Sequence, residues 1–170
     1  MMFGNWTRKE NYEGALWFIN NVSPFLDIKT TIKIIGRKFP IEKINNSNPL
    51  VTYEVLGFVD DPYDILSKSK CLISPLFNGA GIKVKVIESL ACGTPVVTYR
   101  TGGSPEALTP ETGIVVERGD VKEMADAIMT TLTKTKETID ACRQRAVSNY
   151  DKDVCFLEYA KLYSELISKH

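Results

Sequence analysis

The chain has 170 residues, of which 44% are hydrophobic and 25% charged, the size and composition of one soluble globular domain. Its 21 acidic residues balance its 21 basic ones, so net charge offers no general attraction to nucleic acid or to an anionic membrane. Four widely spaced cysteines and a single histidine, His170, argue against a zinc site or a disulfide framework. With no signal peptide and no 18-residue apolar run, the expected location is the cytoplasm.

Strand and helix patterns alternate along the chain, and glycines or strand ends recur about every 20 residues between positions 36 and 116. Asn11 is expected to cap the first helix, Asp61 another, and Asp120 a third. The pattern predicts a Rossmann-like α/β fold over residues 1–170, a three-layer αβα sandwich with a six-stranded parallel sheet and C-terminal helices. The predicted strands are residues 1–4, 30–36, 51–56, 71–74, 95–99 and 113–116.

Residues 74–99 form a predicted strand end, glycine loop, helix and next strand in one run. The loop consists of small residues, Asn78, Gly79, Ala80 and Gly81. Backbone N–H groups in such a loop can approach an anion closely. The helix is predicted to begin near Ile82, where its unpaired amides and its dipole favour a phosphate, and Lys83 and Lys85 add positive charge.

Glu88 follows in the same helix, roughly 9 Å along the axis from the loop. That is about the distance from a diphosphate to its ribose, and a carboxylate is the acceptor that a ribose diol needs. A purely conformational loop, solvated lysines and a surface glutamate would explain the same residues. The loop lacks the Gly-Lys-Ser/Thr of a Walker loop and the Gly-x-Gly-x-x-Gly of a dinucleotide fold.

Another strand end carries candidate residues. Gly36 and Arg37 follow the second predicted strand at its carboxyl end, where doubly wound sheets bind their ligands. A solvated basic pair, Arg37 with Lys38, is the competing interpretation. Trp6 is interpreted as a packing residue, with a platform for a base as the alternative.

The segment from Pro75 onward resembles the C-terminal donor-binding domain of retaining glycosyltransferases with the two-domain B-type fold, the group 1, family 4-like enzymes. The resemblance rests on Gly79, Gly81, Glu88 and the run Ala91-Cys92-Gly93-Thr94-Pro95-Val96-Val97, followed by Gly102-Gly103-Ser104-Pro105-Glu106. It covers essentially the whole chain and is specific from position 57 to 117.

The resemblance implies roles for particular residues. Glu88 matches the second glutamate of the family's signature, which holds the ribose hydroxyls, whereas the first falls on Ala80. The diphosphate contacts would come from Gly4, Asn5, Arg8 and Lys9 at the first strand end, although Glu10 stands where relatives have a lysine. Phe58 and Val59 would lie against the base, and Lys83 and Lys85 would stabilise the leaving group.

The implied function is donor binding in an enzyme that transfers a hexose from a UDP- or GDP-linked sugar to a glycan or lipid-linked acceptor, in polysaccharide or glycan biosynthesis. No cofactor and no metal is expected, and no nucleic acid partner. The acceptor site would lie on an N-terminal domain outside these residues, so this chain alone would transfer nothing. The resemblance is compatible with peripheral membrane association of the full enzyme. It also implies that aromatic residues of the last helix are partly exposed.

Two alternatives stay open. A sugar-nucleotide epimerase shares the architecture, but it would need catalytic acids and a histidine that the sequence does not offer at a suitable place. A non-catalytic nucleotide-binding or interaction module would explain the departures at Asn5, Glu10 and Ala80 as lost chemistry.

Overall fold

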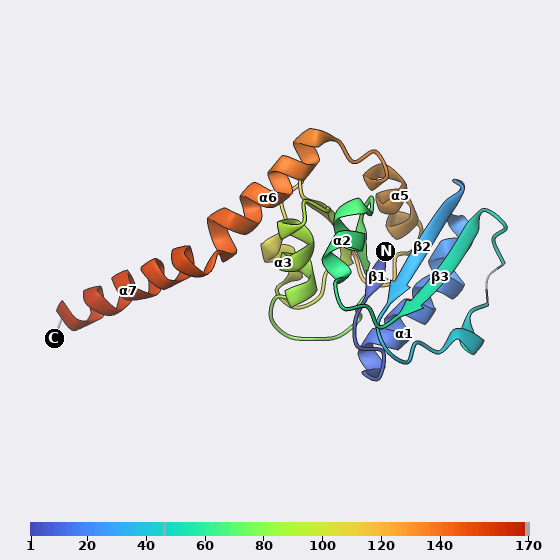
Figure 1. Ribbon diagram of the computed structural model, residues 1–170, viewed down its shortest axis with the longest axis horizontal. Coiled ribbons are helices and arrows are strands. Elements are labelled where there is room, and N and C mark those ends of the chain that lie inside the picture. The colour runs from blue at the N-terminus through green and yellow to red at the C-terminus, as the bar shows by residue number, and fades with distance from the viewer. Residues whose placement is uncertain (46, 169–170) are drawn as a thin grey trace.

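The computed structural model describes residues 1–45 and 47–168, and its strands and helices alternate along the chain (Figure 1). His170 lies outside the described residues. The strands are β1 (Met2–Phe3), β2 (Thr30–Ile35), β3 (Val51–Gly57), β4 (Leu72–Ser74), β5 (Val96–Tyr99) and β6 (Gly113–Val116). The α-helices are α1 (Lys9–Trp17), α2 (Pro62–Lys68), α3 (Val84–Ala91), α4 (Ser104–Ala107), α5 (Val121–Thr131), α6 (Lys136–Tyr150) and α7 (Lys152–Ser168). A π-helical turn (Phe18–Val22) and a 3₁₀ turn (Ser23–Phe25) continue α1, and a further 3₁₀ turn spans Ile41–Lys43.

The strands form two three-stranded parallel sheets, β1-β2-β3 and β4-β5-β6, so the predicted single six-stranded sheet is wrong. The two sheets meet at Met1, whose amino group donates to the carbonyl of Cys71 (2.7 Å) and whose own carbonyl accepts from the amide of Ile73 (2.8 Å). β1 lies against β4, but it pairs as a strand only with β2, so the two sheets are separate.

Helices cover both faces of the β4-β5-β6 sheet, whereas alternate side chains of β3 in the other sheet are exposed. Ile73 and Val97 pack with residues of α1 and α5 in one hydrophobic cluster. Leu72 and Val96, their immediate chain neighbours, pack in a second cluster with residues of α2, α3 and α6. Successive side chains of a strand point to opposite faces, so β4 and β5 are buried along their whole length and are mostly apolar.

The position of α1 depends on Gly14. A β-carbon at this residue would overlap the carbonyl oxygen of Pro75, which lies just after β4. Only glycine therefore lets α1 lie this close to the chain that leaves β4. The contact brings the loop after β1 next to the loop after β4.

The last helix, α7, extends away from the rest of the protein (Figure 1). No residue of α7 is buried, and Phe156, Tyr159 and Tyr163 are largely exposed. The expectation of exposed aromatics on the last helix is confirmed.

Candidate functional site

A cavity of about 450 Å³ opens at the carboxyl ends of β1 and β4. One wall is the loop after β1 with the start of α1, and the other is the loop between β4 and α3 with the first turn of α3. The lining residues are Phe3, Gly4, Asn5, Arg8, Glu10, Asn11, Leu76, Asn78, Gly79, Ala80, Ile82, Lys83, Val84 and Lys85. The structure thus brings most of the predicted diphosphate-binding residues into one cavity.

Side chains hold the wall after β1 in place. The amide oxygen of Asn5 accepts from the backbone N–H of Thr7 (3.1 Å) and from its hydroxyl (2.7 Å). Asn11 donates from Nδ2 to the carbonyl of Asn5 (2.8 Å). The prediction that Asn11 caps the helix is wrong, because α1 begins at Lys9 with Arg8 at the N-cap. Asn11 instead ties the helix to the loop.

The glycine loop bends through left-handed backbone conformations at Gly79 and Gly81. Lys83 folds back over the loop: its Nζ donates to the carbonyl of Ala80 (2.8 Å) and occupies the space that a side chain at position 79 would need. Helix α3 begins at Val84, two residues later than predicted. The first two residues of the helix, Val84 and Lys85, both line the cavity, and their backbone amides are among those left unpaired by the helix.

Lys85 reaches across the cavity to the wall formed by β1. Its Nζ lies 3.4 Å from the carbonyl oxygen of Phe3 and close to Gly4. Burial, and to a lesser degree the charge of Lys83, lowers the pKa of Lys85 to about 8. The ammonium group is thus held in a partly dehydrated place, where an anion would stabilise its charge.

The protein does not neutralise the cations of this cavity. The ion pairs in the described part of the chain are Lys9 with Glu13, Lys68 with Asp64, and Arg100 with Glu117. Arg8, Lys83 and Lys85 are in none of them. One carboxylate, that of Glu10, also lines the cavity. The cavity therefore has the charge that a phosphate-containing ligand requires.

Lys9 and Gly81 do not line this cavity. Lys9 pairs with Glu13 (3.6 Å) and lines a shallow neighbouring pocket with Glu10 and Asn78. Gly81 accepts a backbone hydrogen bond from Gly103 (3.0 Å), which ties the glycine loop to the chain after β5.

Glu88 lies outside the cavity lining, partly exposed on α3. Its Oε1 accepts a hydrogen bond from the hydroxyl of Tyr63 on α2 (2.9 Å). It is neither buried in the core nor free in solvent, and its role with a ribose stays a prediction. Sequence reasoning missed Tyr63, because only the packing of α2 against α3 brings these two residues together.

The predicted base-binding residues form a separate group at the ends of β2 and β3. The amide of Gly36 donates to the carbonyl of Gly57 (2.6 Å), and the guanidinium of Arg37 lies over the ring of Phe58, 4.2 Å from its centroid. Phe58 is largely exposed, whereas Val59 packs against the second hydrophobic cluster. This group does not line the cavity.

Trp6 is a packing residue, as predicted. It is buried, its Nε1 donates to the carbonyl of Ile35 (2.9 Å), and its ring meets Phe39 edge-on at 5.1 Å. A β-carbon at Gly36 would overlap the carbonyl oxygen of Gly4 and crowd this indole, so the ends of β1 and β2 approach each other only because position 36 is glycine.

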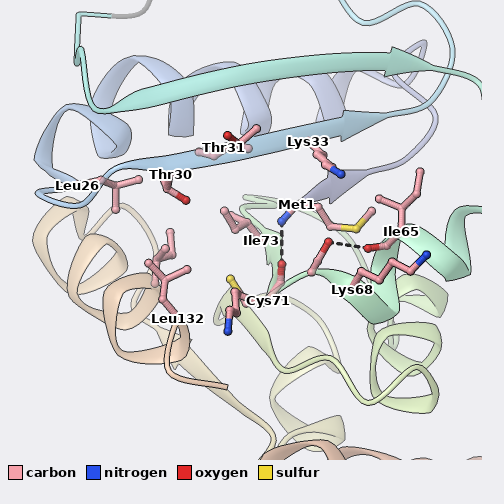
Figure 2. Close-up of a pocket in the computed structure, with 14 residues that line it drawn as sticks. Met1, Leu26, Thr30, Thr31, Lys33, Ile65, Lys68, Cys71, Ile73 and Leu132 are labelled. Carbon is pink, nitrogen blue, oxygen red and sulfur yellow. Dashed lines mark hydrogen bonds between the residues drawn. The ribbon is translucent and has the colours of Figure 1, made fainter. Parts of the chain in front are cut away.

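A second cavity, of about 180 Å³, lies at the opposite ends of the strands (Figure 2). Met1, Leu26, Thr30, Cys71 and Leu132 are among the residues that line it. None of the predicted site residues, all of which the structure describes, takes part. The larger of these two cavities is therefore the one at the carboxyl ends of the strands, where α/β folds bind their ligands, and it is the one that the predicted residues line.

Two further properties bear on the predicted chemistry. Among the described residues, no three histidine, cysteine, aspartate or glutamate side chains gather closely enough to hold a metal ion, and the absence of a metal requirement stays a prediction. Within the same residues, no helix has the length and apolar character needed to cross a membrane.

Comparison with known proteins gives consistent matches. Residues 1–134 match the family described as Glycosyl transferases group 1. A stretch of 49 residues is 41% identical to a GDP-mannose-dependent monoacylated alpha-(1-6)-phosphatidylinositol monomannoside mannosyltransferase of Corynebacterium glutamicum, and covers 29% of this chain and 13% of that protein.

Solved structures show the same fold. The sucrose-phosphate synthase of Thermosynechococcus elongatus has a TM-score of 0.72 at 20% identity, over 99% of this chain and 45% of its own. Alr3699/HepE of Anabaena, solved in complex with UDP, has a TM-score of 0.71 at 17% identity, over 96% of this chain and 48% of its own. The chain spans less than half the length of each of these proteins.

Proposed function

Because this chain belongs to the glycosyl transferases of group 1, as the sequence resemblance predicts, we propose that it is the donor-binding domain of a glycosyltransferase. Its ligand is a nucleoside-diphosphate sugar, UDP- or GDP-linked. The enzyme moves a hexose to a glycan or lipid-linked acceptor in the cytoplasm. The acceptor site belongs to an N-terminal domain, which is consistent with the greater length of the matched proteins.

One observation supports this proposal above the others: Arg8, Lys83 and Lys85 line one cavity at the carboxyl ends of parallel strands, and none of them is in an ion pair with a described residue. In α/β folds this is where ligands bind. The names of the relatives agree with it, since one uses GDP-mannose and another was solved with UDP.

The chemistry follows from the same cations. When the bond between the sugar and the terminal phosphate oxygen breaks, its electrons stay on that oxygen, which becomes more negative. Lys85 and the amides at the start of α3 are positioned to stabilise this charge in a partly dehydrated place. Cations and a helix terminus would neutralise the diphosphate without a metal.

Calorimetric titration of the 170-residue chain with UDP, GDP and ADP tests the proposal. We expect UDP or GDP to bind with a dissociation constant of about a millimolar or less, and Lys85→Met to weaken binding about tenfold or more. Lys29→Met, which removes an exposed lysine away from the cavity, is the matched control. Failure of all three nucleotides to bind at millimolar concentration would contradict the proposal.

A further inference from the structure

The hydrogen bond between Tyr63 and Glu88 joins two helices that are separate in sequence. Tyr63 lies in the first turn of α2 and Glu88 in the middle of α3, and the two atoms are 2.9 Å apart. Within residues 1–45 and 47–168, no other side chain donates to this carboxylate. Helices α2 and α3 lie side by side (Figure 1).

Both ends of this hydrogen bond are anchored. Asp61 caps α2 by accepting from the backbone N–H of Tyr63 itself (2.9 Å), which sets the direction in which the tyrosine leaves the helix. Leu66 of α2 packs with Val86 and Leu90 of α3 in the second hydrophobic cluster. The packing of the helices therefore places Tyr63 and Glu88 within hydrogen-bonding reach of each other.

The bond uses only part of what the carboxylate can accept. An ionised carboxylate offers about four lone-pair positions on two oxygens, and the hydroxyl of Tyr63 takes one of them on Oε1. Among the described residues, none donates a hydrogen bond to Oε2. The hydrogen bond, followed by the negative charge of Glu88, raises the pKa of Tyr63, as expected when a phenol donates to an ionised acceptor.

We propose that Tyr63 is a positioning residue for nucleoside recognition: its hydroxyl holds the carboxylate of Glu88 in one orientation, with Oε2 presented to the ribose diol. This inference rests on the proposed function, because it assumes that a nucleotide binds beside α3. An oriented acceptor binds a hydroxyl at a smaller entropic cost than a free side chain does. Tyr63 thus contributes to the preference for ribose over deoxyribose without touching the nucleotide.

The test is a comparison of UDP and GDP with their 2′-deoxy forms, by calorimetry, on the unmodified chain and on Tyr63→Phe. We expect the ribo form to bind about tenfold more tightly than the deoxy form in the unmodified chain, and this ratio to fall to about threefold in Tyr63→Phe. Tyr159→Phe, on the exposed helix α7, is the matched control and should leave the ratio unchanged. Glu88→Ala should abolish the preference, and adding Tyr63→Phe to it should change nothing further.

The outcomes separate the two proposals. If no nucleotide binds to the unmodified chain, both fail. If nucleotides bind but Tyr63→Phe keeps the full ribose preference, or binds UDP more tightly, Tyr63 does not position Glu88 and only this inference is overturned. A second readout needs no nucleotide: in tyrosine-labelled protein, the pKa of Tyr63 measured by NMR should be lower in Glu88→Ala than in the unmodified chain. An unchanged pKa would also overturn the inference.

Discussion

The candidate site has two parts that are built in different ways. The proposed diphosphate part is a cavity between the loops after β1 and β4, closed by Lys85, whose side chain contacts the opposite wall. The proposed nucleoside part consists of two side-chain pairs near the surface, Tyr63 with Glu88 and Arg37 with Phe58. The first part depends on backbone packing and the second on side chains, so mutations should affect them differently.

Gly14→Ala should have the largest effect, because it disrupts the packing of α1 against the chain after β4, which forms the cavity. The added methyl group would overlap the carbonyl oxygen of Pro75, so α1 would have to move. We expect a loss of about 3 kcal/mol in the free energy of unfolding, measured with urea. Glu13→Ala, at the preceding and exposed position of α1, is the control. A change below about 0.5 kcal/mol would mean that α1 is not held at this distance.

Lys85→Met separates stability from binding in the diphosphate part. Burial disfavours the charged form of Lys85 in the folded protein, so its removal should raise the free energy of unfolding at pH 7 by about 1 kcal/mol. The same variant should bind both UDP and inorganic pyrophosphate about tenfold more weakly. A variant that lost affinity for UDP but kept it for pyrophosphate would place Lys85 in the nucleoside part instead.

The pH dependence of binding should follow Lys85. Its pKa in the folded chain is about 8, below the ordinary value of 10.5, so the ammonium is lost from the cavity as pH rises through 8. Affinity for pyrophosphate should fall by up to about tenfold between pH 7 and 9. Over about pH 8 to 10.5 the unfolded chain binds more protons, so the free energy of unfolding should rise. In Lys85→Met, the decrease in pyrophosphate affinity between pH 7 and 9 should be absent.

Phe58→Ala tests the nucleoside part alone. The guanidinium of Arg37 lies over the ring of Phe58. Because this ring is also exposed, a base can stack on it. We expect about fivefold weaker binding of UDP or GDP and unchanged binding of pyrophosphate. Phe25→Ala removes an equally exposed ring elsewhere and should affect neither. Equal losses for nucleotide and pyrophosphate would show that the two parts are not independent.

Glu10→Gln should have the smallest effect, and in the opposite direction. Its carboxylate lines the same cavity as Arg8 and Lys85 and opposes a bound anion. Because Glu10 is exposed and screened by solvent, we expect only about a twofold gain in affinity for pyrophosphate, and a smaller gain at high salt. Glu42→Gln is the control for the change in net charge.

Much of the site could be predicted because it depends on local pattern. Glycines between a strand and a helix, with lysines at the helix start, indicate a loop at the carboxyl end of a sheet, and there the structure places Gly79, Lys83 and Lys85. The start of α3 was predicted two residues early, because Ile82 continues the apolar pattern although it precedes the helix. Helix boundaries depend on local hydrogen bonds that periodicity does not reveal.

By itself, the sequence determined the alternation of strands and helices, the family, and the local chemistry of the glycine loop, because these depend on residues that are close together in the chain. Only the tertiary structure decided that the strands form two sheets, that Gly14 seats α1 against Pro75, and that Tyr63 meets Glu88. These contacts join residues far apart in the chain, and they depend on how the strands and helices pack against one another. The local periodicity of the sequence therefore does not predict them.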